Sequence, residues 1–129
     1  MERIKYIPGD LVSVYVGIEK YIVEVIDTKN EDEVFLYKIK FPNGEIQYAD
    51  NDNIVPIPLT PEILDKNGWE HKDDVYWKHY SYFDLVIYTK ERELYITNIK
   101  DSIYLREVKY VHQLQQCLSG LNLDSNINI

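Results

Sequence analysis

The sequence predicts an α+β protein that is mainly β, and three observations lead to this prediction. Several short runs alternate apolar and polar residues, as half-buried strands do. The pair Asn43-Gly44 is the strongest short signal for a hairpin turn. The segment 108–121, VKYVHQLQQCLSGL, carries its apolar residues at helical spacing. We therefore expect antiparallel strands followed by a packed C-terminal helix.

The first half of the chain is expected to form five short strands. They are predicted at 10–17, 20–28, 34–41, 45–49 and 54–57. The charged stretch 29–33 and the polar stretch 50–53 are predicted as solvated turns between strands. Short strands that follow one another in meander order suggest a small SH3-like barrel over residues 1–58.

A proline-rich junction leads into the second half, residues 59–129. Thr60 is a good N-cap for a short helix over Pro61–Lys66, and Asn67-Gly68 provides its stop. Antiparallel strands are then expected at 75–82, 84–90 and 93–99, and 101–108 is either a fourth strand or the approach to the final helix. The last eight residues either fray or add an edge strand. We expect the two halves to pack as one compact unit.

Composition limits the classes of partner. The chain has 129 residues and 45% apolar residues, enough for a core, and a net charge of -8, which disfavours non-specific binding to phosphate backbones. A single cysteine excludes an intramolecular disulfide and a cysteine-based zinc cluster, and it suits a reducing compartment. The N-terminus lacks the apolar core of a signal peptide, and no apolar run approaches the ~20 residues of a membrane span. We expect a cytoplasmic protein without membrane contact.

Three segments resemble a known group of proteins: GDLVSVYV, then IPLTPEILDKNGW followed by VYWKHYSYF, and finally VKYVHQLQQCLSGL. Together they are similar to small uncharacterised proteins of gut anaerobic bacteria and of their phages and mobile elements. The resemblance covers about residues 56–121 and is looser over the N-terminal strands. Trp69 stands where that group usually has another aromatic residue. The resemblance implies origin and fold, and it carries over no catalytic residue and no activity.

The histidines and the cysteine do not form a recognisable site. His112 and Cys117 lie about 140° apart around a helix, so they cannot act as a dyad, and Cys117 falls on the apolar stripe. His71 and His79 lack the spacing of metal ligands. No phosphate-binding glycine loop, nucleophile elbow or zinc-protease motif is present. We expect no catalytic residue, no cofactor and no metal site.

Acidic residues form one candidate surface. Glu31, Asp32 and Glu33 lie in one predicted turn, and Asp50 and Asp52 lie in another. Such runs are most often solvated turns. If the two turns lie together, they would form an acidic face that contacts a basic partner or imitates phosphates.

Aromatic residues form the second candidate surface, along 75–82. Alternation places Tyr76, Lys78, Tyr80 and Tyr82 on one face of the strand, and Val75, Trp77 and His79 on the other. If the valine and tryptophan face packs under the helix, the tyrosine face is half exposed and suits an interface.

These observations favour a non-enzymatic protein-binding or self-associating module. The partner is expected to be a protein or a second copy of the chain, with nucleic acid unlikely. The alternative class is a nucleic-acid-directed protein: a weak single-strand binder through the Tyr/Lys face, or an acidic mimic that blocks a nucleic-acid enzyme. An enzyme of unknown type is a third class.

Overall fold

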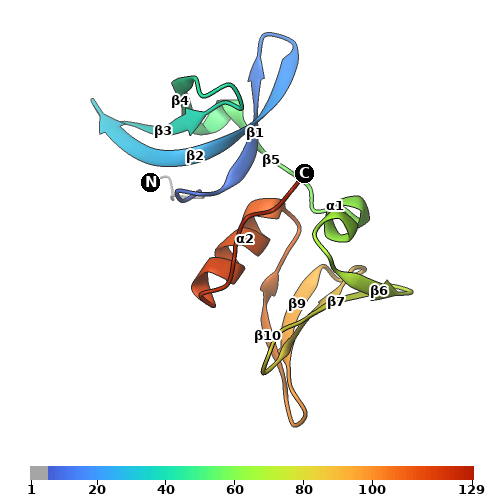
Figure 1. Cartoon of the computed structure of the whole chain (residues 1–129). Helices are drawn as coiled ribbons and strands as arrows, with labels where there is room; N and C mark the ends of the chain where they lie inside the picture. Colours follow the sequence, from blue (N-terminus) through green and yellow to red (C-terminus); the bar gives the residue numbers. More distant parts are fainter. Residues whose placement is uncertain (1–5) are drawn as a thin grey trace.

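The computed structural model describes residues 6–129, which form two five-stranded antiparallel sheets and two α-helices. Helix α2 (Val111–Gly120) lies between the sheets and contacts β1 of the first and β10 of the second (Figure 1). The prediction of a mainly β chain with a C-terminal helix is therefore confirmed.

The first sheet has the strand order β4-β3-β2-β1-β5. Its strands are β1 (Leu11–Val16), β2 (Glu19–Glu31), β3 (Val34–Lys40), β4 (Ile46–Asp50) and β5 (Ile54–Pro56). Strands β4 and β5 have no pairing with each other among the described residues, so hydrogen bonding leaves the sheet open. A closed SH3-like barrel is therefore not formed by these strand pairs, and it stays a prediction.

Strand β2 is longer than the sequence suggested. It continues through most of the charged stretch to Glu31, so the turn shrinks to Asp32 and Glu33, which both have positive φ (48° and 68°). This is the geometry of a tight two-residue hairpin, whose twist matches that of the strands. A register shift between Val25 and Asp27 interrupts pairing with β3, and such bulges bend a long strand. The polar stretch after β4 forms the 3₁₀ helix η1 (Asn51–Asn53).

The second sheet has the order β10-β9-β8-β7-β6. Its strands are β6 (Glu70–Lys72), β7 (Val75–His79), β8 (Asp84–Tyr88), β9 (Glu93–Thr97) and β10 (Ser102–Glu107). The fourth expected strand is thus present as β10, and β6 is an additional short strand that the sequence did not indicate. A register shift after Tyr104 marks a bulge in β10.

Each sheet has its own core, and both helices pack on the second. Helix α1 (Pro61–Lys66) begins as expected, with Thr60 Oγ1 accepting a hydrogen bond from Ile63 N at 3.3 Å. Helix α2 places Val111, Leu114 and Leu118 in the core of the second sheet, as predicted. The members of that core on the sheet are Tyr76, Leu85, Ile87 and Leu94. The first core is formed by Val12, Val14, Val23, Val25, Tyr37 and Ile39 with Tyr6, Phe41 and Ile54.

The C-terminal tail neither frays nor adds a strand. It returns along the second core, where Ile127 is buried. Asn67 Nδ2 donates to the Asn128 carbonyl at 2.8 Å, and Asn67 Oδ1 accepts from Asn128 N at 2.8 Å. A side-chain amide thus pairs with the tail as a strand neighbour would.

The two halves are connected by polar side chains of α2. Gln115 Oε1 accepts from Leu11 N at 2.8 Å, and Gln115 Nε2 donates to the carbonyls of Gly9 at 3.1 Å and Ser125 at 3.2 Å. Gln116 Nε2 donates to Asp10 Oδ2 at 2.8 Å. Burial raises the pKa of Asp10, and the hydrogen bonds that it accepts from Ile7 N and from Gln116 only partly offset its desolvation. The division into residues 1–58 and 59–129, packed as one compact unit, stays a prediction.

We expect Gln115→Leu to lower the free energy of unfolding by roughly 1–3 kcal/mol, because it leaves the Leu11 N and the Gly9 carbonyl without their part-buried hydrogen bonds. Urea denaturation measures this change. The control is Gln47→Leu on the exposed strand β4, which should change stability by less than about 0.5 kcal/mol. Equal losses in both variants would contradict this account of how α2 is held.

Candidate functional site

Strand register aligns four apolar side chains across the second sheet. Trp77 pairs with Val86, Val86 with Tyr95, and Tyr95 with Tyr104. Side chains on one strand alternate between faces. Since Leu85, Ile87 and Leu94 point into the core, this row lies on the opposite face of the sheet. We call Trp77, Val86, Tyr88, Tyr95 and Tyr104 the outer aromatic face.

The tyrosines of the outer aromatic face pack against one another. The ring centroids of Tyr88 and Tyr95 lie 5.3 Å apart, and those of Tyr95 and Tyr104 lie 5.4 Å apart, both edge to face. Tyr88 and Tyr104 remain 39% and 49% exposed. None of the five residues belongs to either core of the described chain. A contiguous apolar surface of this kind is typical of a binding site.

Carboxylates border the aromatic rings. Trp77 Nε1 donates a hydrogen bond to Glu70 Oε2 at 3.1 Å, and the Tyr95 hydroxyl donates to Glu93 Oε1 at 3.4 Å. Glu70 is the strand partner of Trp77, and Glu93 is that of Tyr88, so both acids lie on the same face as the rings. The face therefore combines flat aromatic area with negative charge.

His79 joins two of these acids. Its Nδ1 lies 2.7 Å from Asp84 Oδ1, and its Nε2 lies 3.1 Å from Glu70 Oε2. The hydrogen bond to Asp84 raises the pKa of His79 above its usual value, and the charges of Asp84 and Glu70 act in the same direction. All three side chains are solvent-exposed, so the network orients the edge of the face more than it stabilises the fold.

The expected interface of Tyr76, Lys78, Tyr80 and Tyr82 has to be corrected. Tyr76 is only 5% exposed and belongs to the core, so the buried and exposed faces of β7 are the reverse of those predicted. The reason is the position of the helices, which pack on the tyrosine side of the strand. Lys78 Nζ donates to the Asn67 carbonyl at 3.0 Å after α1, and the Tyr80 ring stacks on Phe83.

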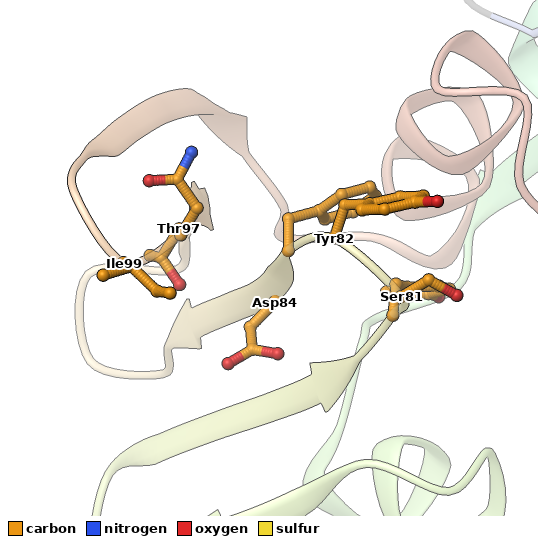
Figure 2. A pocket seen from close by; sticks show the side chains of 8 residues that line it. Ser81, Tyr82, Asp84, Thr97 and Ile99 are labelled. Carbon is orange, nitrogen blue, oxygen red and sulfur yellow. The ribbon is translucent and has the colours of Figure 1, made fainter.

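Tyr82 differs from the other three residues, because it is 91% exposed beyond the end of β7. It borders a hollow of about 400 Å³ lined by 80–84 and 97–99. Figure 2 shows Tyr82 and Ile99 on either side of Asp84 in this view. Asp84 and Thr97 are strand partners on the same face as the aromatic row, so the hollow adjoins the outer aromatic face.

The predicted acidic face has local structural roles. Asp50 Oδ1 accepts from the backbone N of Asp52 and of Asn53, both at 3.1 Å, and thereby caps η1. Glu31 pairs with Lys29 at 2.9 Å beside the turn of Asp32 and Glu33. Lys29 Nζ also lies 5.1 Å from the centre of the Tyr48 ring. A binding role for these carboxylates stays a prediction.

The candidate residues of α2 are packing residues. His112 is buried against the rings of Tyr6 and Tyr110, at centroid distances of 4.8 and 5.9 Å. Cys117 is half-buried on the second core, and burial raises the pKa of its thiol, which disfavours the nucleophilic thiolate.

Within residues 6–129, no group of three or more His, Cys, Asp or Glu side chains is placed to hold a metal ion. The helices of this part of the chain are too short and too polar to cross a bilayer.

Comparisons with protein-family models, with curated proteins and with solved structures found no match to this chain.

We expect His79 to titrate above its usual value of 6.5, and Asp84→Asn to lower its midpoint, because the variant removes the negative charge beside Nδ1. A pKa raised by folding means that protonated His79 favours the folded state below pH 6.5, and that this contribution is lost as pH rises through the raised value. NMR titration of the imidazole protons measures the midpoint. The control is Glu31→Gln, an equal charge change on the first sheet, which should leave the His79 midpoint unchanged. A midpoint that Asp84→Asn does not change would disprove the pairing of His79 with Asp84.

Proposed function

We propose that the protein is a non-enzymatic binding module that contacts a protein partner through the outer aromatic face. The observation that carries the proposal is the row Trp77-Val86-Tyr95-Tyr104, which crosses four strands without joining either core. Aromatic side chains contribute large contact area at low entropic cost, and they are enriched in protein interfaces. A rigid sheet holds these rings in place before a partner arrives, which lowers the cost of binding.

A nucleic-acid-directed role receives less support. Tyr76 is buried, so the Tyr/Lys face that would stack on bases is incomplete. On the outer aromatic face, Glu70 and Glu93 lie beside the rings and would repel phosphates. The acidic-mimic alternative rests on charge alone, and Asp50 there serves as a helix cap.

The fold and setting of the module are part of the same proposal. The order β4-β3-β2-β1-β5, the bulge in the long strand β2 and the turn η1 before β5 support an SH3-like arrangement of the first half. A free, half-buried cysteine is compatible with a cytoplasmic setting. Origin from a phage or mobile element remains a prediction from the resemblance.

The test is capture of partners from a lysate of the host, with and without nuclease, using Tyr88→Ser/Tyr104→Ser. We expect this variant to retain about tenfold less of a specific protein than the unmodified chain does, equivalent to about 1.4 kcal/mol. The matched control is Tyr15→Ser/Tyr48→Ser on the first sheet, where the rings are 51% and 49% exposed. Circular dichroism confirms that each variant is folded.

Three results would contradict the proposal. The first is a loss of the partner by the control variant that equals the loss by the outer-face variant. The second is full retention of the partner by the outer-face variant. The third is capture of nucleic acid that disappears with nuclease, which would favour the alternative class.

A further inference from the structure

We propose that the outer aromatic face binds an extended, arginine-rich segment of its partner. This inference rests on the proposed function and specifies the chemistry of the partner. It follows from three properties of the face: its charge, the placement of acids beside rings, and its width.

The charge of the face is negative. Strand register puts the carboxylates Glu70, Asp84, Glu93 and Glu107 on the same side as the aromatic row. Among the lysines of strands β6 to β10, Lys72 lies on that side of the sheet. Lys78 points to the inner side, toward Asn67. The whole chain has a net charge of -8, so the electrostatic field beyond the face has the same sign as the face. A cationic segment is attracted, and polyanions are repelled.

The placement of acids beside rings favours arginine. A guanidinium is planar, stacks on aromatic rings and binds a carboxylate through two donors at once. Glu70 lies 3.1 Å from the Trp77 indole nitrogen, and Glu93 lies 3.4 Å from the Tyr95 hydroxyl. A guanidinium over either ring can therefore reach a carboxylate without leaving the ring face. The lysine ammonium lacks the planar stacking surface and the fork of donors.

The width of the row sets the length of the segment. Neighbouring strands lie about 4.8 Å apart, so the three intervals from β7 to β10 span roughly 14 Å. An extended chain advances about 3.3 Å per residue, so four to five residues cross the row. Alternate residues of such a segment point to the same side, which places arginines at every second position on the face.

A second copy of the chain fits this face less well. Face-to-face contact would bring Glu70, Asp84 and Glu93 of one copy toward the same acids of the other, and like charges brought together oppose association. A cationic segment is therefore the occupant that the face favours.

The test is binding of three labelled nine-residue peptides to the full chain, measured by fluorescence anisotropy. Their alternate positions are arginine, lysine or glutamine, separated by serine. We expect the arginine peptide to bind several-fold more tightly than the lysine peptide, and the glutamine peptide to bind weakest. Affinity should fall as ionic strength rises above ~0.1 M, because the contacts are exposed.

Matched variants localise the binding. The variant Glu70→Gln/Glu93→Gln keeps the side-chain oxygens that accept hydrogen bonds from Trp77 and Tyr95, but it removes two negative charges. It should weaken binding of the arginine peptide roughly three- to tenfold. Glu31→Gln/Glu33→Gln removes the same charge at the β2–β3 turn and should leave the affinity unchanged. Thermal unfolding checks that both variants are folded.

The inference is overturned if the control variant loses as much affinity as the outer-face variant, if the glutamine peptide binds as well as the arginine peptide, or if a labelled single-stranded oligonucleotide binds more tightly than the arginine peptide. These failures are separable from failure of the proposed function. Suppose that a captured protein is lost with Tyr88→Ser/Tyr104→Ser but retained with Glu70→Gln/Glu93→Gln. This result would support the outer aromatic face as the binding site and contradict a cationic segment as its occupant.

Discussion

The position of helix α2 determines which surfaces of the protein are buried. Its apolar side, with Val111, Leu114 and Leu118, completes the core of the second sheet. Its polar residue Gln115 hydrogen-bonds the backbone of Leu11 and Gly9 in the first half. Because a buried side-chain amide without a partner costs more than one hydrogen bond gains, the pairing of buried Gln115 holds the helix in one register between the sheets. The remaining packing follows from that placement.

The outer aromatic face is a consequence of this placement. A sheet has two faces, and α2 with α1 covers the one that carries Tyr76, Leu85 and Ile87. The opposite face of the same strands keeps its aromatic rings in a connected row, bordered by carboxylates. The same sheet therefore provides a stable core on one side and a preorganised surface on the other. This division of roles is common in antiparallel sheets, which need only one buried face.

Much of the fold could be predicted from the sequence, because its signals are local. Thr60 and Pro61 start α1 where expected, Asn43-Gly44 connects β3 and β4, and the strands lie close to the alternating runs. The departures have different causes. Strand β6 pairs with β7 across the short turn at Asp73 and Asp74, but its three exposed residues carry no apolar alternation that would mark a strand. The tail is ordered because Asn67 pairs with Asn128, 61 residues further along, and local patterns contain no information about so distant a partner.

The candidate site was only partly predictable. Alternation correctly separated Tyr76 from Trp77, but β7 has aromatic residues on both faces and gives no preference between them. The usable signal was in β8, where Leu85 and Ile87 are aliphatic while Asp84 on the other face is charged. By itself the sequence determined where strands, turns and helices form, because caps, turn residues and alternation act between near neighbours. Only the tertiary structure decided which aromatic residues face solvent, because that depends on which side of the sheet α2 covers and on the register that aligns separate strands.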